Sequence, residues 1–216
     1  MSGALSGKRV LVTAGGTREP LDAVRYIGNR SSGLMGVAVA AEARRRGADV
    51  TLIASNLSVP PPEDVEVVEA PTAADVERET QSRADADVVI MAAAISDYRP
   101  AETEATKRPK DESTWQIELE PTTDVLKLLG EHRANGQVLI GFAAETGEGG
   151  LERARKKLAT KQVDLIVYND VSREDVGFDA DDNEVVIVSG GGERRVDKAP
   201  KDEIAAAILD EVERLT

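Results

Sequence analysis

The chain contains no cysteine, and this absence excludes several kinds of chemistry. Without thiols the protein can form no disulfide, bind no metal through thiolates and use no cysteine nucleophile. A thiol in its reaction would therefore have to come from a substrate. A chain without cysteine also suits a reducing compartment.

Long apolar runs are missing as well. No stretch approaches the roughly 18 apolar residues that a membrane span needs. Residues 1–9 lack the apolar centre of a secretory signal. We therefore expect a cytoplasmic protein that has no membrane partner.

Positive charge is in short supply. The formal net charge is -13, with 27 lysine and arginine residues against 40 aspartate and glutamate residues. This balance disfavours general binding to nucleic acid, because phosphate polymers are bound by clustered cations. We expect no nucleic-acid partner. Any phosphate that the protein binds must bind where the surface is locally less acidic than the rest of the chain.

Neither a histidine base nor an acidic metal loop is favoured. The single histidine, His132, lies near the end of a predicted helix, where it suits the negative end of the helix dipole better than the role of general base. The acidic run 179–184 lacks the glycine and the distal glutamate of an EF-hand, so we expect a solvated turn there. Metal ligands remain unknown from the sequence.

What the chain does have is the pattern of an α/β protein. Apolar runs alternate with helix-like segments, as in a parallel sheet whose strands are joined by helices. With 216 residues and 41% hydrophobic content, the chain can bury a proper core. We predict a Rossmann-like, mostly parallel sheet flanked by helices, in a single domain over residues 1–216. The predicted strands are 9–13, 49–54, 65–69, 87–94, 138–142 and 164–168, and the predicted helices are 33–47, 72–84, 122–133, 149–162 and 199–215.

Two segments interrupt this alternation. Residues 100–121 begin and end with proline, carry Lys107 and Arg108, and finish in an alternating, strand-like pattern from Trp115. We expect them to form an arm or hairpin inserted into the α/β repeat. A second hairpin is predicted at 185–196, where three glycines separate two strand-like runs.

The first strand leads into a candidate anion cradle. Gly15 and Gly16 end it, and a second turn at Ser31, Ser32 and Gly33 opens the next predicted helix. Bare backbone N–H groups and a helix N-terminus both favour phosphate. The order of residues fits neither G-x-G-x-x-G nor G-x-x-x-x-G-K-[ST], so the cradle is not one of the two common nucleotide fingerprints.

Other candidate binding residues follow later strands. Asp97 comes after a strand that ends in small residues, where a ligand could approach the backbone. It could hold a sugar hydroxyl or a metal, or only stabilise a turn. Phe142 could contact a base or belong to the core. Lys157 and Lys161 lie on one helical face and form either a polyphosphate clamp or a solvated surface.

Five motifs in sequence order form a recognisable set. They are residues 15–22 (GGTREPLD), 29–36 (NRSSGLMG), 92–100 (AAAISDYRP), 141–146 (GFAAET) and the lysine, aspartate and asparagine residues between 157 and 170. Together they closely resemble phosphopantothenoylcysteine synthetase, the ligase half of the bifunctional coenzyme A biosynthesis protein of bacteria and archaea. The resemblance runs from about Leu5 to Leu215.

This resemblance implies a two-step ligation. CTP would activate the carboxylate of 4′-phosphopantothenate as an acyl-cytidylate and release pyrophosphate, and the amine of L-cysteine would then displace CMP. A nucleotide is needed because a carboxylate is a poor electrophile until its oxygen becomes a leaving group. Mg²⁺ would be expected to offset the charge of the triphosphate.

The resemblance also implies roles for particular residues. Asn29 would act in binding and turnover of the acyl-cytidylate, and Lys107 would reach the triphosphate from the arm; these are the two candidate catalytic residues. The CTP site would comprise Met91, Ala92, Ala93, Asp97, Lys107, Thr123, Asp124, Val125, Leu126, Phe142, Lys157 and Lys161. The substrate cradle would comprise Gly15, Gly16, Asn29, Ser31, Ser32 and Gly33.

Three places depart from the family pattern. The arm reads Lys107-Arg108-Pro109-Lys110 where Lys-Ile-Lys-Lys is usual, so one lysine is lost, and Arg108 could compensate for it. Leu34 stands where the serine-glycine turn usually continues with lysine. Residues 122–125 (TTDV) replace the frequent Asn/Thr-Pro-Asp-Ile.

Two other functions compete with the ligase as interpretations of the sequence. A short-chain NAD(P) oxidoreductase needs T-G-x-x-x-G-x-G and a Tyr-x-x-x-Lys pair, and the sequence has neither. A non-enzymatic nucleotide-binding module stays open because the arm is altered. The resemblance further implies a homodimer with the arm at the partner's active site, and a phosphopantothenoylcysteine decarboxylase, fused or separate, whose catalytic cysteine this sequence lacks.

Overall fold

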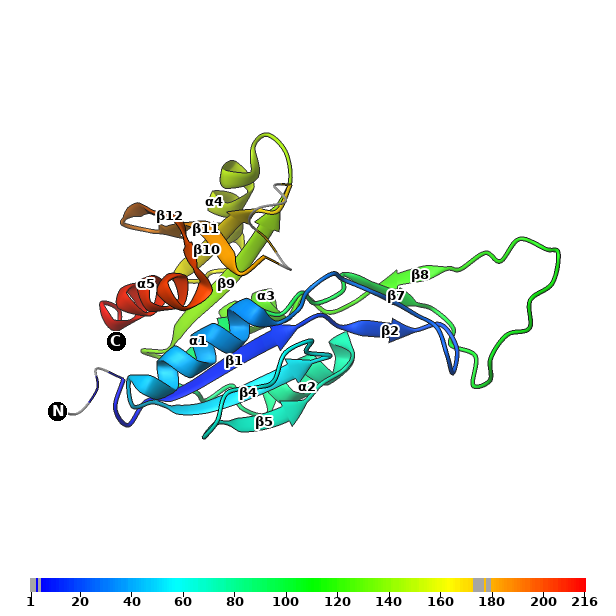
Figure 1. Cartoon of the computed structure of the whole chain (residues 1–216), viewed down its shortest axis with the longest axis horizontal. Helices are drawn as coiled ribbons and strands as arrows, with labels where there is room; N and C mark the ends of the chain where they lie inside the picture. The colour runs from blue at the N-terminus through cyan, green and yellow to red at the C-terminus, as the bar shows by residue number, and fades with distance from the viewer. Residues whose placement is uncertain (1–2, 4, 173–176, 178–179) are drawn as a thin grey trace.

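An eight-stranded sheet forms the centre of the molecule (Figure 1). The computed structural model describes residues 3, 5–172, 177 and 180–216, and the sheet has the order β12-β11-β10-β9-β6-β1-β4-β5. The parallel strands are β1 (Arg9–Gly15), β4 (Asp49–Ser55), β5 (Glu66–Glu69), β6 (Val88–Met91), β9 (Val138–Glu145) and β10 (Leu165–Asp170). The predicted hairpin, β11 (Asp182–Ser189) and β12 (Gly192–Pro200), adds antiparallel strands at one edge. The predicted α/β class is confirmed.

Helices cover both faces of the sheet. One face packs against α1 (Leu34–Arg45) and α5 (Lys201–Glu213), and the other against α2 (Ala73–Gln81), α3 (Val125–His132) and α4 (Gly150–Thr160). A strand buried on both faces has no polar side, and β6 accordingly reads Val-Val-Ile-Met with every residue buried. No helix in the described ranges is long and apolar enough to cross a membrane.

Some element ends differ from the prediction for local reasons. α3 begins at Val125 and not at Thr122, because the Asp124 side chain accepts a hydrogen bond from Lys127 N (3.0 Å) and caps the helix. β6 ends at Met91, and beyond it Ala93 N donates to Thr13 Oγ1 (3.0 Å). His132 is the last residue of α3, as its dipole role requires, and its Nδ1 lies 2.9 Å from Leu128 O.

The solvated turn predicted at 179–184 is wrong for residues 182–184. They begin β11, and the side chains of Asn183, Val185 and Ile187 are buried in alternation. The acidic composition of the run concealed this two-residue period, which is the signal of a half-buried strand. Asp179 lies outside the described residues.

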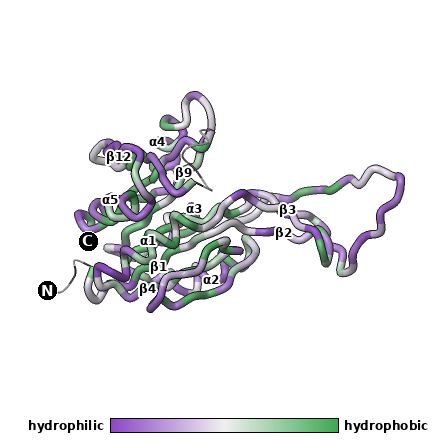
Figure 2. The backbone as a smooth tube through the Cα atoms, viewed as in Figure 1, coloured by the Kyte–Doolittle hydropathy of each residue, from purple (hydrophilic) through white to green (hydrophobic). Residues whose placement is uncertain are grey.

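An arm projects from the body of the molecule. β2 (Arg18–Pro20) pairs with β3 (Tyr26–Gly28), and β7 (Tyr98–Pro100) pairs with β8 (Leu119–Pro121). Figure 1 shows both pairs extending away from the main sheet toward the loop 101–118, and Figure 2 shows that loop mainly in hydrophilic colours. The β7–β8 pair and the loop 101–118 form where the sequence predicts an arm, but strand pairing begins at Leu119 and not at Trp115, whose ring contacts two arginines. The sequence patterns did not predict the β2–β3 pair.

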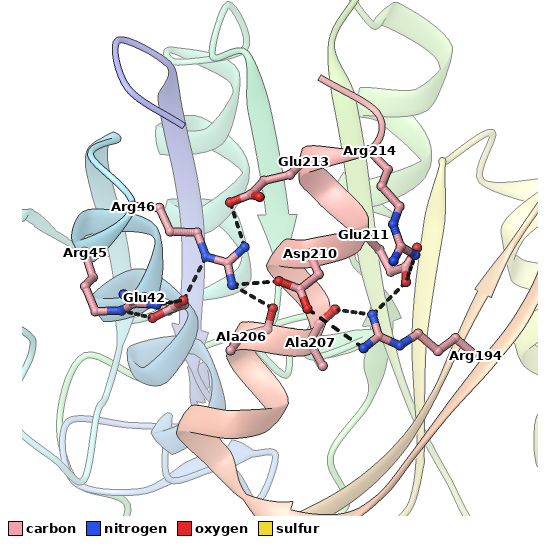
Figure 3. A network of polar contacts seen from close by, with 10 residues as sticks. All are labelled: Glu42, Arg45, Arg46, Arg194, Ala206, Ala207, Asp210, Glu211, Glu213 and Arg214. Carbon is pink, nitrogen blue, oxygen red and sulfur yellow. Dashed lines mark hydrogen bonds and ion pairs between the residues drawn. The ribbon is translucent and has the colours of Figure 1, made fainter. Parts of the chain in front are cut away.

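Charged side chains join the C-terminal halves of α1 and α5 (Figure 3). Arg46 donates to Glu42 (2.8 Å) and, on α5, to Asp210 (3.0 Å) and Glu213 (2.7 Å). The Arg46 and Glu42 side chains are only 11% and 10% exposed. Because buried charges need close partners, this network fixes how the two helices pack.

Candidate active site

A cavity of about 530 Å³ lies where strands end and helices begin. The carboxyl ends of β6, β9 and β10 reach it, as do the N-terminal ends of α1, α3 and α5. Parallel strands expose their carboxyl ends at one edge of a sheet, which brings together residues far apart in sequence. The sequence-predicted residues that line it are Asn29, Ser31, Ser32, Gly33, Met91, Ala92, Ala93, Asp97, Thr123, Asp124, Val125, Leu126, Phe142, Lys157 and Lys161.

The N-terminus of α1 forms one wall. Gly33 has a φ of 85°, and a Cβ on it would lie 2.4 Å from the Leu57 side chain, so only glycine fits there. A Cβ on Gly36 would lie 2.5 Å from Ala14 Cβ, which shows how closely the helix approaches β1. The N-cap residue of α1 is Gly33, and no side-chain cap is formed there by the described residues. The first N–H groups of the helix therefore remain available to an anion at the cavity.

Gly15 and Gly16 lie beneath this wall and are not among the described residues that line the cavity. Gly15 has a φ of 91°, and a Cβ on it would meet Ser55 O at 1.9 Å. A Cβ on Gly16 would lie 2.7 Å from Asn29 O. Both glycines allow the chain to pack closely below the cradle. Their contribution to the phosphate cradle stays a prediction.

Asn29 and the loop after β6 form a second wall. Asn29 Nδ2 donates to Ala94 O at 3.3 Å, and the hydrogen bond from Ala93 N to the buried Thr13 hydroxyl fixes the same loop. Asp97 ends the cavity-lining part of this loop. The small side chains of residues 92–94 therefore occupy a fixed place beside the cavity, where a ligand can approach the backbone.

Two of the lysines that line the cavity, Lys157 and Lys161, are each paired with a carboxylate. Lys157 Nζ lies 2.9 Å from Oε1 of Glu145, and Lys161 forms an ion pair with Asp124. Burial lowers the pKa of Lys161, and the nearby charge of Asp97 partly offsets this effect. The lysines are therefore parts of the cavity wall and not freely solvated surface groups.

A polar region of the cavity was missed by the sequence reasoning. Asn169, Asn183 and Lys201 line it and are all at least nine-tenths buried. Asn169 lies opposite Ala144 on the neighbouring strand, and Lys201 Nζ donates to Gly177 O (3.0 Å). Asn169 falls within one of the five motifs and could have been found. Asn183 lies within the acidic run that was expected to be a solvated turn, so nothing indicated a buried residue there. Lys201 is the first residue of α5, where a lysine is usually taken as a surface residue.

Phe142 lies at the border of the hydrophobic core and the cavity, so its position agrees with both roles considered from the sequence, core packing and contact with a base. Its half-buried ring packs against the core beneath α1 and α5, and the residue also lines the cavity. An aromatic face at a strand end offers a contact for a nucleotide base.

Lys107 lies on the arm and is not among the described residues that line the cavity. Its neighbour Arg108 is engaged within the arm: Arg108 N donates to Asp22 Oδ2 (3.2 Å), and its guanidinium lies 5.2 Å from the centre of the Trp115 ring. Arg25 lies 4.5 Å from the same ring. Arg108 therefore makes its contacts within the arm. These contacts argue against the suggestion that Arg108 replaces the lysine that is lost at Pro109.

A resident metal centre finds little support among these residues. No group of three or more histidine, cysteine, aspartate or glutamate side chains that could hold a metal lies together in the part of the chain that the structure describes. At the cavity, Asp97 and Asp124 supply carboxylates. Mg²⁺ in nucleotide sites commonly takes one or two carboxylates together with phosphate oxygens and water, so the residues fit a Mg²⁺ that arrives with a nucleotide.

Comparisons with known proteins place this geometry in context. The family described as the DNA/pantothenate metabolism flavoprotein C-terminal domain matches residues 5–215. The chain is 44% identical over 220 residues to the coenzyme A biosynthesis bifunctional protein CoaBC of Mycobacterium tuberculosis, covering 96% of this chain and 52% of that protein. The chain thus spans about half the length of the curated relatives it matches.

Solved structures have the same fold. The crystal structure of the C-terminal domain of CoaBC is similar with a TM-score of 0.84 and 39% identity, covering 99% of this chain and 98% of that one. A Cab2 variant in complex with phosphopantothenate-cysteine has a TM-score of 0.80 over 96% of this chain and 87% of that one. At 20% identity, this second likeness shows the fold alone.

Proposed function

The chain belongs to the family of the DNA/pantothenate metabolism flavoprotein C-terminal domain, and on this premise we propose that it is a ligase that joins 4′-phosphopantothenate to L-cysteine. The observation that carries the proposal is the composition of the cavity. A helix N-terminus that begins at a glycine, the Asn29 amide, a loop of small residues and the lysines Lys157 and Lys161 meet around about 530 Å³. These groups suit a substrate phosphate and a nucleotide side by side.

The proposed reaction has two steps and uses CTP. A carboxylate oxygen of 4′-phosphopantothenate attacks the α-phosphorus of CTP, and pyrophosphate leaves. The amine nitrogen of L-cysteine then attacks the acyl carbon, and CMP leaves with the electron pair of the broken bond. Mg²⁺ supplies positive charge to the triphosphate when it is bound.

Residues of the cavity divide between these tasks. Lys157 and Lys161 are placed to offset the charge of the triphosphate, Asp97 to accept a ribose hydroxyl and Phe142 to contact the base. Asn29 lies beside the start of α1, where its amide can contact the acyl-cytidylate. The first turn of α1 offers N–H groups to phosphate oxygens.

A homodimer would explain the arm. Among the residues that the structure describes, seven large hydrophobic side chains are exposed, and five of them lie on the arm: Val24, Tyr26, Tyr98, Ile117 and Leu119. Exposed apolar groups gathered on one projection favour a protein contact, and a second copy of this chain is the simplest partner. Lys107 would then act at the cavity of the partner subunit, since the arm extends away from its own body (Figure 1).

The deciding experiment supplies the protein with 4′-phosphopantothenate, Mg²⁺ and CTP, with and without L-cysteine, and measures pyrophosphate and CMP. Pyrophosphate is expected from the activation step, and CMP is expected only in the mixture that contains L-cysteine. CTP binding without pyrophosphate release would favour the nucleotide-binding module instead. ATP in place of CTP tests the choice of nucleotide.

The remaining parts of the proposal concern the cellular setting. A cytoplasmic location suits a cysteine-free chain and a reaction that consumes a thiol amino acid. The product would be consumed by a decarboxylase of phosphopantothenoylcysteine, either fused to this domain or separate. The bifunctional CoaBC relatives, about half of whose length this chain spans, support fusion as one arrangement.

A further inference from the structure

Glu145 stands beside the cavity without being among the described residues that line it. It is the last residue of β9, and its side chain is only 15% exposed. Oε2 accepts a hydrogen bond from Arg153 Nε at 2.6 Å, and Oε1 lies 2.9 Å from Lys157 Nζ. One carboxylate thus joins a cavity lysine to an arginine outside the cavity.

Arg153 gives this carboxylate a fixed orientation. Its Nη1 donates to Glu148 O (3.1 Å) and its Nη2 to Thr146 O (2.9 Å), so the guanidinium is anchored to the backbone between β9 and α4. With Oε2 held by Arg153, Oε1 of Glu145 is directed at Lys157. Glu145 also keeps one cationic partner whatever Lys157 binds.

The ionisation of Glu145 agrees with this arrangement. Burial alone would raise its pKa, but the hydrogen bonds and charges of Lys157 and Arg153 outweigh burial and hold the pKa below its ordinary value. The group is therefore a carboxylate at neutral pH.

Asp124 is built in the same way on another element. Its Oδ1 caps α3 by accepting from Lys127 N (3.0 Å), while Oδ2 pairs with Lys161. In both cases one carboxylate oxygen is tied to the fold and the other is directed at a cavity lysine. The recurrence argues that directing the lysines is the purpose of both carboxylates.

We propose that Glu145 is a positioning residue that holds the ammonium group of Lys157 at the place where the nucleotide polyphosphate binds. The proposal rests on the proposed function, because the polyphosphate is that of CTP. A lysine has a long, flexible stem, and a held lysine loses less conformational freedom when a phosphate binds. If only net charge mattered, removing the Glu145 carboxylate would strengthen CTP binding, because the cavity would then attract the anion more strongly. A positioning role predicts weaker CTP binding.

The test is the kinetics of Glu145→Gln. We expect the KM for CTP to rise about fivefold to tenfold, the effect of losing one charge-assisted hydrogen bond. The KM values for 4′-phosphopantothenate and L-cysteine should stay unchanged. Glu152→Gln is the matched control, because Glu152 lies on α4 and pairs with Arg155 (2.9 Å) without lining the cavity.

A double-mutant cycle separates positioning from general support of the fold. Lys157→Met should raise the KM for CTP, and adding Glu145→Gln to it should cause no further rise, because Glu145 acts through that lysine. Additive effects would mean that Glu145 acts by another route. If Glu145→Gln lowers the thermal midpoint strongly, Glu145→Asp takes its place, since it keeps the charge but shortens the reach to Lys157.

The outcomes distinguish the two proposals. No pyrophosphate from the wild-type protein would overturn the ligase proposal and this one with it. An active wild type whose KM for CTP is unchanged or lowered by Glu145→Gln would overturn the positioning role alone.

Discussion

At the scale of single residues, the cavity depends on polar atoms that the surrounding backbone holds in place. Asn29 illustrates this, because its backbone carbonyl lies where a Cβ on Gly16 would collide and its amide donates to Ala94 O. The exposed Asn29 therefore contacts the loops that follow both β1 and β6. A change of its side chain alters the functional group that contacts the loop after β6.

Replacing that amide with a carboxylate should impair the reaction. Asn29→Asp loses the donor to Ala94 O and places a negative charge beside the proposed phosphate site, so we expect CMP formation to fall about tenfold or more, equivalent to ~1.4 kcal/mol in the barrier. Asn135→Asp makes the same chemical change at an exposed position away from the cavity and should leave the rate unchanged. A normal product yield from Asn29→Asp would remove Asn29 from the mechanism.

At the scale of elements, α1 and α5 line the cavity with their N-terminal ends and are joined by a charged network near their C-terminal ends. Gly33 and Lys201, at their N-termini, line the cavity, while Arg46 joins their C-terminal halves (Figure 3). Breaking the network should therefore loosen the packing of two elements that shape the cavity.

Arg46→Met is expected to destabilise the protein by about 2 kcal/mol, because it leaves the buried Glu42 with one fewer cation while Arg45 still pairs with it. Urea denaturation at pH 7 measures the loss. Arg195→Met removes an exposed arginine from a surface pair and should change stability little. Equal midpoints for Arg46→Met and wild type would show that the network is dispensable.

The same network predicts a pH dependence with a definite sign. Burial raises the pKa of Glu42, but hydrogen bonds from Arg45 and Arg46 outweigh it and lower the pKa in the folded state. The stabilisation is therefore complete above the pKa of Glu42 in the unfolded chain, about 4.3, and is lost as pH falls below it toward the lower pKa of the folded state. The stability difference between wild type and Arg46→Met should shrink between about pH 5 and pH 3, and a constant difference would contradict this account.

At the scale of the whole molecule, the arm separates Lys107 from the cavity on its own body. Its Arg25, Arg108 and Trp115 contacts give it a defined shape, and its exposed apolar side chains suit a second copy. If the arm acts across a dimer, each active site takes residues from two chains.

Mixing two impaired variants tests whether the arm acts across a dimer. Lys107→Gln and Asn29→Asp should each be impaired alone, yet heterodimers would contain one intact site, so random exchange restores up to about a quarter of wild-type activity. Gel filtration should show a dimer for both variants. Absence of recovery in a mixture proven to exchange subunits would place Lys107 outside the partner's site.

The sequence alone determined the α/β class, the order along the chain of the strands in the main sheet, and many of the residues that line the cavity. Strands such as β6 are apolar throughout because both faces are buried, and the turns after them carry small residues and Asp97, so these features are written in local patterns. The motif resemblance then named the family before any contact was known.

Only the tertiary structure decided which of these residues meet and what each contacts. Gly15 and Gly16 have no room for a side chain, because carbonyls of Ser55 and Asn29 occupy the space that a Cβ would need. Glu145 and Lys201 acquired partners through long-range packing that no local pattern records. Local sequence governs element type through burial and capping, whereas the contacts of a charged side chain depend on which distant segments the sheet order brings beside it.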